Sequence, residues 1–176
     1  MEIKIEDLKV LFSEEQLQSR IQELADEMNE FYNGEEVIAI CVLKGAVMFA
    51  TDLVRNLNMP LKMEFIRLSS YGSSTTTSGK VNAVDISLPD LNEKNVLIIE
   101  DIVDTGLTAK FLMDFMHCNF HAKSIKFCSL LDKKITRKVD IEPDYYGFEI
   151  DNKFVVGYGL DYDGLYRNLK YIGYKE

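Results

Sequence analysis

The 176-residue chain lacks the features by which membrane, secreted and multidomain proteins are usually recognised. No apolar stretch approaches the roughly 18 residues that a transmembrane helix needs. The first residues contain no basic segment followed by an apolar one, so we expect no signal peptide. There is no internal repeat and no obvious linker. Because this length suits one well-buried core, we predict a single domain over residues 1–176.

Cysteine is scarce as well. The chain has three cysteines, Cys41, Cys118 and Cys128, and an odd number argues against a disulfide framework. Their spacing does not suit a metal site, and each lies in an apolar stretch. Buried, reduced thiols are the simplest interpretation, and they predict a cytoplasmic protein.

Positive charge is in short supply. The chain has 20 lysines and arginines against 29 aspartates and glutamates, which gives a net charge of −9. This balance argues against general affinity for nucleic acid or for an anionic membrane surface. If the ligand of such an acidic protein is itself an anion, lysines, arginines or a metal ion must be concentrated at the binding site.

Segments with helical periodicity alternate with short apolar runs that are typical of buried strands. Helices are predicted after a capping box at Ser13 and Gln16, over residues 46–57, and from residue 107 onward. Strands are predicted at residues 37–42, 62–68, 81–86, 96–99, 124–131, 145–148 and 154–158. This alternation predicts an α/β fold with a doubly wound, mostly parallel central sheet flanked by helices.

Three further features of the pattern are predictions about detail. The first helix should end at Asn33 and bury its apolar stripe, which consists of Leu17, Ile21, Leu24, Met28 and Phe31. Residues 69–79, rich in serine and threonine, should form a surface loop that is either a lid or an ordinary flexible segment. Residues 132–176 are less regular and should form a small C-terminal cap.

The segment from Val96 to Thr108 carries the strongest functional signal. Four apolar residues predict a buried strand that ends at two adjacent acids, Glu100 and Asp101, and a polar turn with Gly106 then leads into a helix. Free N–H groups at the start of a helix suit a phosphate, and paired acids can hold Mg²⁺ or bind sugar hydroxyls. The pattern therefore favours a sugar phosphate as the ligand.

Several of the candidate residues also have plainer interpretations. Adjacent acids after a strand often only begin a solvated loop, Lys44 suits a solvated turn, and Phe154 suits a core position in a short strand. His117 and His121 lie four residues apart and could share a metal, but no third ligand accompanies them. Their place near a predicted helix end is equally natural for cationic residues.

Five segments of the chain resemble the type I phosphoribosyltransferases, and their order and spacing are similar to the hypoxanthine-guanine branch in particular. The resemblance covers about residues 36 to 170 and is carried by residues 42–45, 67–72, 100–108, 129–134 and 148–162. Two positions depart from the broader family: Leu107 stands where some members have lysine, and Asp132 where others have an apolar residue. We interpret Asp132 as a group that could tune the charge of the lysine after it.

The resemblance implies a binding site for 5-phosphoribosyl 1-diphosphate. The residues that would bind the 5′-phosphate are Asp104, Thr105, Gly106, Leu107 and Thr108. Glu100 and Asp101 would bind the ribose hydroxyls and, together with Asp161, hold Mg²⁺. Lys44 and Gly45 would contact the diphosphate through a loop that begins with a cis peptide bond before the lysine.

The resemblance also implies a site for a 6-oxopurine base. Lys133 would donate to the 6-oxo group, Phe154 would stack on the ring, and the backbone of Val155 would bind its edge. Asp104 would be the acid/base group at purine N7. Further contacts are assigned to Arg167 on the diphosphate and to Ser70 and Tyr71 over the reacting centre, and Arg137 would add local positive charge.

The implied function is a Mg²⁺-dependent purine salvage enzyme that converts hypoxanthine, and also guanine, with 5-phosphoribosyl 1-diphosphate into IMP or GMP and diphosphate. The enzyme is expected to be a homodimer or homotetramer. Two alternatives remain open: a regulator of the same fold that binds nucleic acid and senses phosphoribosyl diphosphate, and an enzyme acting on a pyrimidine, orotate or adenine. The net charge of −9 disfavours the first, and Lys133 followed by Phe154 and Val155 disfavours the second.

Overall fold

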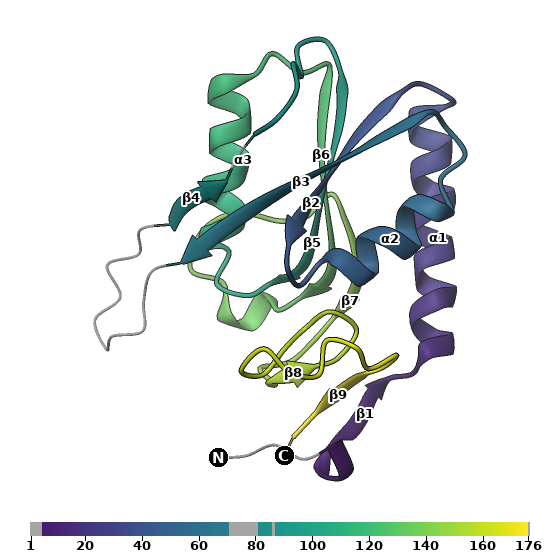
Figure 1. Ribbon diagram of the computed structural model, residues 1–176, viewed down its shortest axis with the longest axis vertical. Helices are drawn as coiled ribbons and strands as arrows, with labels where there is room; N and C mark the ends of the chain where they lie inside the picture. The colour runs from purple at the N-terminus through teal and green to yellow at the C-terminus, as the bar shows by residue number, and fades with distance from the viewer. Residues whose placement is uncertain (1–4, 71–80, 86, 176) are drawn as a thin grey trace.

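The computed structural model describes residues 5–70, 81–85 and 87–175. Within these residues, six strands form a central sheet in the order β4-β3-β2-β5-β6-β7 (Figure 1). All neighbouring strands are parallel except β3 and β4, which are antiparallel. The strands are β2 (Val37–Leu43), β3 (Leu61–Ser70), β4 (Val81–Asp85), β5 (Asn95–Val103), β6 (Ser124–Asp132) and β7 (Tyr145–Glu149). The predicted doubly wound, mostly parallel sheet is confirmed.

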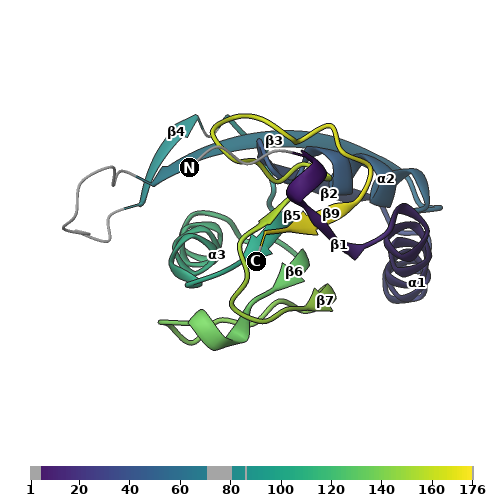
Figure 2. The same ribbon diagram turned by 90° about the horizontal axis from the view of Figure 1, so that it is seen from below.

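Helices cover both faces of this sheet. Helices α1 (Glu14–Tyr32) and α2 (Val47–Arg55) lie on one face, and α3 (Leu107–Asn119) lies on the other (Figure 2). Along β5, Leu97 and Ile99 pack with α1 and α2, whereas Val96 and Ile98 pack with α3. Because successive side chains of a strand point to opposite faces, a sheet covered on both sides requires such an unbroken apolar run.

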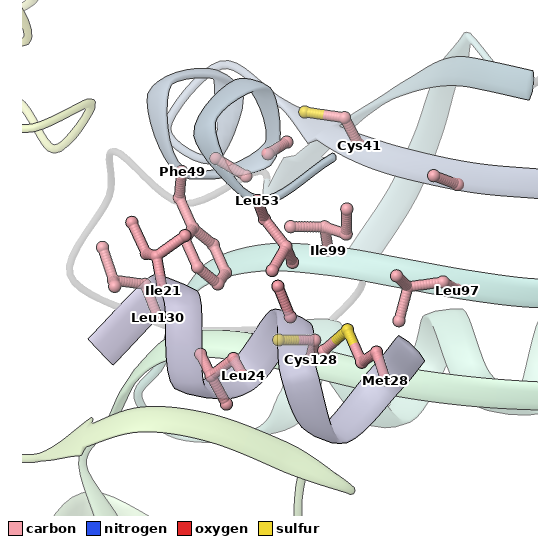
Figure 3. Packing of buried hydrophobic residues seen from close by; sticks show 14 of the residues in the cluster. Ile21, Leu24, Met28, Cys41, Phe49, Leu53, Leu97, Ile99, Cys128 and Leu130 are labelled. Atoms are coloured by element: carbon pink, nitrogen blue, oxygen red, sulfur yellow. The ribbon is translucent and has the colours of Figure 1, made fainter. Parts of the chain in front are cut away.

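Helix α1 begins and ends where the sequence predicts. The Ser13 hydroxyl accepts a hydrogen bond from the N–H of Gln16, and the Gln16 side chain accepts one from the N–H of Ser13, so the capping box is complete. At the other end, Asn33 adopts the left-handed conformation with φ of 46°. Between these ends, Ile21 and Leu24 pack against side chains of α2 and of the sheet (Figure 3).

Two helical residues are exposed where the sequence analysis predicted burial. Phe31 is 48% exposed, because Tyr32, four residues after Met28, continues the buried stripe of α1 in its place. Cys118 is exposed because the buried side of α3 is marked by Met116, and a residue two positions further on points to the opposite side. Cys41 and Cys128 are buried as predicted, and all three cysteines are free thiols.

A second, three-stranded antiparallel sheet forms a hood beyond the carboxyl ends of the central strands (Figure 1). It consists of β1 (Lys9–Phe12), β9 (Ile172–Tyr174) and β8 (Val155–Val156), in that order. The predicted cap from residues 132–176 supplies two of these strands, and β1 adds a third from the opposite end of the sequence. A 3₁₀ turn, η2 (Lys134–Thr136), follows β6, and another, η1 (Ile5–Asp7), precedes β1.

The predicted serine-rich loop falls largely outside the described residues. Ser69 and Ser70 belong to β3, where they pair with Asn82 and Val81 of β4, so the strand is longer than predicted. Residues 71–79 and Ile86, the last residue of the predicted strand 81–86, lie outside the described residues. Among the helices that the structure describes, none has both the length and the apolar character needed to cross a bilayer.

Candidate active site

Strand β5 runs further than the sequence predicts. It continues through the acid pair to Val103, with Glu100 opposite Ser129 and Val103 opposite Asp132 of β6. The prediction that the strand ends before Glu100 is therefore wrong, because the ladder with β6 persists for four more residues. The two acids therefore lie within a strand that is paired with β6. They are near the carboxyl ends of the parallel strands, where ligands of doubly wound folds bind.

Both carboxyl groups lie where ionisation is unfavourable. Burial raises the pKa of Glu100 well above its usual value, and the charge of Asp101 raises it further. Burial also raises the pKa of Asp101 to about 6, although backbone N–H groups and the charge of Arg167 act in the opposite direction. In the described part of the chain, Glu100 Oε2 is buried and has no hydrogen-bond partner. A bound cation, or hydroxyl groups of a ligand that donate to the carboxylates, would offset the cost of ionising such a buried pair.

The turn after β5 and the start of α3 form one side of a cavity of about 140 Å³. Gly106 caps α3 in the left-handed conformation, with φ of 81°. The first turn of a helix has backbone N–H groups without intrahelical partners, which suit an anion. Of the predicted phosphate-binding residues, Asp104, Thr105, Gly106 and Thr108 line this cavity together with the acid pair, whereas Leu107 does not.

Asp104 is held between two residues of the segment that follows β6. Lys133 Nζ lies 3.3 Å from one carboxylate oxygen of Asp104, and the Thr136 hydroxyl donates to the other. Lys133 is 6% exposed and is the one buried lysine among the described residues. The side chain of Asp104 is 49% exposed, so its carboxylate faces solvent and is accessible to a ligand.

The loop after β2 brings Lys44 and Gly45 to the same side of the sheet as the acid pair, at the carboxyl ends of the parallel strands. The peptide bond between Leu43 and Lys44 is cis, as the resemblance implies. Gly45 lies so close to the acid pair that a Cβ atom on it would overlap Asp101 Oδ2. This position therefore requires glycine. Lys44 is exposed.

The segment of the hood that connects β8 to β9 packs directly onto this loop. Gly159 has φ of 102°, and a Cβ atom on it would overlap the carbonyl oxygen of Gly45. Arg167 donates to the carbonyl oxygen of Gly159 at 2.6 Å and forms an ion pair with Asp161 at 2.6 Å. Asp161 lies close enough to Asp101 for its negative charge to raise the pKa of that carboxyl group. The charges of Arg167 and Asp161 therefore both act on Asp101 of the acid pair.

Phe154 lies on the hood and is 55% exposed. Its ring meets that of Tyr162 edge to face, with 5.8 Å between the ring centroids. The interpretation of Phe154 as a core aromatic is therefore wrong, and an exposed ring offers a face on which a heterocycle can stack. Val155, next to it, is buried and begins β8.

Three predicted residues are placed differently or not at all. Ser70 ends β3, and Tyr71 lies outside the described residues. Arg137 does not line the cavity, and its guanidinium group instead faces Asp132 and backbone carbonyl oxygens. Thr136 was not among the predicted site residues; it reaches Asp104 only because η2 turns the chain back toward β5.

The sequence profile of the family described as "Phosphoribosyl transferase domain" matches residues 10–163 of this chain. The chain belongs to the phosphoribosyltransferase family. Membership confirms the resemblance seen in the sequence. It also accounts for three features that occur together here: the acid pair, the hood, and the turn of residues 104–108, which we call the phosphate-type turn.

Relatives and solved structures are similar over nearly the whole chain. The "Hypoxanthine-guanine phosphoribosyltransferase" of Bacillus subtilis is 47% identical over 165 residues, which cover 94% of this chain and 91% of the relative. A crystal structure of a hypoxanthine-guanine phosphoribosyltransferase from Bacillus anthracis has a TM-score of 0.90 and 44% identity, and covers 99% of this chain and 100% of that one. The "Bifunctional protein TilS/HprT" of Listeria monocytogenes is also 47% identical, but the chain spans only 25% of its length.

The residues of the site fit the Mg²⁺ ion that the family resemblance implies. Glu100 Oε2 is a buried carboxylate oxygen without a partner among the described residues, and Asp101 is adjacent to it. Within the same residues, no group of three or more His, Cys, Asp or Glu side chains could hold a metal ion, so His117 and His121 form no such site. Mg²⁺ is commonly held by one or two carboxylates together with water and substrate phosphates, and this arrangement suits that mode.

Proposed function

We propose that this phosphoribosyltransferase transfers the 5-phosphoribosyl group of 5-phosphoribosyl 1-diphosphate to hypoxanthine and to guanine. The products are diphosphate and IMP or GMP. The observation that carries the proposal is that the acid pair, the phosphate-type turn and Asp104, which pairs with the buried Lys133, line one cavity. Relatives named hypoxanthine-guanine phosphoribosyltransferase match nearly full length, which supports the same conclusion.

The phosphate and the ribose would be bound by the carboxyl end of β5 and the start of α3. The N–H groups of residues 104–108 and the hydroxyls of Thr105 and Thr108 would donate to the 5′-phosphate. Glu100 and Asp101 would accept hydrogen bonds from the ribose hydroxyls. Their negative charge would also stabilise the positive charge that develops on the ribose ring as its bond to diphosphate breaks.

The purine would lie between the hood and Asp104. Lys133 would donate to its 6-oxo group, Phe154 would stack on its ring, and the Val155 backbone would bind its edge. Asp104, accessible at the cavity, would take the proton from N7 as the purine forms its bond to C1 of the ribose. A 6-amino group cannot accept a hydrogen bond from Lys133, so adenine should be a poor substrate.

The diphosphate would lie near Lys44, Gly45 and Arg167. When bound, Mg²⁺ supplies positive charge that neutralises the departing diphosphate. Glu100 and Asp101 would hold it together with diphosphate oxygens. Asp161, the third ligand that the resemblance implies, belongs to no group of three potential metal ligands among the described residues and instead forms an ion pair with Arg167. Lys44, Arg167 and the bound Mg²⁺ would provide the local positive charge that a chain of net charge −9 requires in order to bind a polyanion.

An ultraviolet assay tests the proposal directly. The protein is mixed with 5-phosphoribosyl 1-diphosphate and Mg²⁺, and hypoxanthine, guanine, xanthine, adenine and orotate are added in separate reactions. Nucleotide should form from hypoxanthine and guanine and scarcely from adenine or orotate. Absence of nucleotide with every base, or its appearance when no base is added, would overturn the proposal.

We further propose a cytoplasmic homodimer or homotetramer in which residues 1–176 form a single domain, with residues 132–176 providing much of the base-binding cap. The rival function, a nucleic-acid-binding regulator, requires a basic face that a net charge of −9 disfavours. Gel-shift titration with RNA and DNA at low salt separates the two, because a regulator should bind and the enzyme should not.

A further inference from the structure

The segment after β6 holds the outer side of the phosphate-type turn through three consecutive backbone carbonyl groups. The carbonyl oxygen of Val103 accepts hydrogen bonds from Lys133 N–H at 2.9 Å and from Arg137 Nη2 at 3.5 Å. The carbonyl oxygen of Asp104 accepts from Arg137 Nε at 3.3 Å. The carbonyl oxygen of Thr105 accepts from Lys138 N–H at 2.9 Å.

This arrangement fixes the direction of the N–H groups on the inner side of the turn. In a planar trans peptide, the C=O of one residue and the N–H of the next point in opposite directions. When the carbonyl groups of residues 103, 104 and 105 are held on the outer side, the N–H groups of Asp104, Thr105 and Gly106 are directed away from it. These three residues line the cavity, which is where the 5′-phosphate would bind.

Arg137 is suited to this task because its guanidinium fork is itself held. Asp132 is 0% exposed and forms an ion pair with Arg137 Nη2, while Arg137 Nη1 donates to the carbonyl oxygen of Ile141. The aliphatic part of the Arg137 side chain also packs against the turn. A Cβ atom on Gly106 would lie only 2.6 Å from Arg137 Cδ. A lysine offers a point charge and could not donate in several fixed directions.

We propose that Arg137, held in place by Asp132, is a positioning residue that presets the backbone N–H groups of residues 104–106 for the 5′-phosphate. This inference rests on the proposed function, because it assumes that a phosphoribosyl ligand occupies the cavity. It also gives Asp132 a role: its carboxylate balances the charge of Arg137 rather than tuning that of Lys133.

The substitution Arg137→Lys tests the inference. It keeps the charge but removes the fork, so the KM for 5-phosphoribosyl 1-diphosphate should rise about tenfold or more. The KM for hypoxanthine, measured with the phosphoribosyl substrate saturating, should stay within about twofold. A loss of fold would not produce this split, because it lowers the amount of active protein without changing either KM.

Arg20→Lys is a matched control. Arg20 also donates to two backbone carbonyl oxygens, those of Tyr146 and Gly147, both at 3.0 Å, and pairs with Glu23, but it lies on α1 away from the cavity. Both KM values should be unchanged in this variant. Asp132→Asn, which preserves side-chain shape and removes the charge, should raise the KM for the phosphoribosyl substrate in the same direction as Arg137→Lys, and carries the test if Arg137→Lys does not fold.

The outcomes separate the inference from the proposed function. If the wild-type protein forms no nucleotide from any base, the proposed function fails. If the wild-type protein is active but Arg137→Lys, or Asp132→Asn in its place, leaves the KM for the phosphoribosyl substrate within about twofold, only the inference fails. A similar rise of this KM in Arg20→Lys would also refute it, because the effect would then not be specific to the turn.

Discussion

At the scale of single residues, the proposed chemistry depends on how Asp104 is held. One carboxylate oxygen faces Lys133 at 3.3 Å and the other accepts from the Thr136 hydroxyl. This orientation leaves little rotational freedom for the side chain while about half of it stays exposed. A carboxylate held in this way can receive a proton from a base at the cavity without first reorganising.

Asp104→Asn should therefore remove proton transfer and leave the shape of the site intact. Turnover should fall about 100-fold or more, because a positioned acid/base group commonly contributes that much. The KM for 5-phosphoribosyl 1-diphosphate should change little, since the backbone N–H groups that would bind the phosphate are retained. Steady-state kinetics with hypoxanthine measure both effects. The control is Asp114→Asn on the exposed side of α3, where Asp114 pairs with Lys110, and unchanged turnover in Asp104→Asn would remove Asp104 from the mechanism.

The raised pKa of Asp101 makes a prediction about stability in the absence of ligand. Burial raises this pKa from 3.8 to about 6, so the folded chain holds a proton that the unfolded chain releases near pH 4. The contribution of this group to stability is fully present below pH 4 and is lost as the pH rises through 6. Asp101→Asn removes the buried charge and should stabilise the ligand-free protein by about 3 kcal/mol at pH 8.

Urea unfolding at pH 4, 6 and 8 measures this difference. The gain from Asp101→Asn should be near zero at pH 4, where the wild-type carboxyl group is neutral, and should grow through pH 6. Asp26→Asn, on the exposed side of α1, is a control that should show no such trend. A gain of equal size at all three pH values would show that ionisation of Asp101 is not its cause.

At the scale of elements, the sequence predicts what hydrophobic periodicity and capping determine. The buried strands, the three helices and the capping box at Ser13 were predictable because each is a local pattern. Strands β1 and β9 were missed because they are only four and three residues long and their partners lie at the opposite end of the sequence. The continuation of β5 through Glu100 was missed because two charged residues resemble a loop, and only pairing with β6 shows otherwise.

The same distinction holds within the site. Its residue types followed from the signature between Glu100 and Thr108 and from the family resemblance, and the structure brings the acid pair and four of the five predicted phosphate-binding residues to one cavity. What could not be predicted are contacts made across the fold. The donation of Thr136 to Asp104 and the turn of Arg137 toward backbone carbonyl groups depend on how η2 returns the chain, which leaves no periodic signal in the sequence.

The contact between the hood and the Lys44–Gly45 loop gives a prediction about these elements. In Gly159→Ala, the new Cβ atom would overlap the carbonyl oxygen of Gly45, so the hood should move away from the loop. The KM for 5-phosphoribosyl 1-diphosphate should rise and turnover should fall, each by about tenfold, because misplacement by about 1 Å has effects of this order or larger. Steady-state kinetics with both substrates measure the change.

Gly164→Ala is the matched control for this effect. Gly164 also has a positive φ, 79°, but a Cβ atom there would meet nothing within 4 Å. Both variants therefore carry backbone strain, and only Gly159→Ala adds the overlap with the loop. If the two variants lose activity equally, strain in the hood is sufficient to explain the loss, and the contact with Gly45 has no separate role.

At the scale of the whole molecule, we expect the stability of the fold not to depend on metal bound at the proposed site. The core on both faces of the sheet is apolar, and no group of three or more potential ligands among the described residues could hold a metal ion. The protein should therefore fold without Mg²⁺. A divalent cation should bind well only when the substrate diphosphate supplies the remaining oxygen ligands.

Thermal unfolding with EDTA, Mg²⁺ alone, 5-phosphoribosyl 1-diphosphate alone, and both together tests this coupling. EDTA and Mg²⁺ alone should each leave Tm nearly unchanged. EDTA should nevertheless abolish nucleotide formation. The two ligands together should raise Tm by more than the sum of their separate effects, because each creates ligands for the other. At concentrations near 100 times Kd, the stabilisation should be about 2.7 kcal/mol, or several degrees for a chain of this length. If Mg²⁺ alone raised Tm as much as the pair, Glu100 and Asp101 would already form a complete metal site with groups of the protein, and the dependence of metal binding on substrate would be refuted.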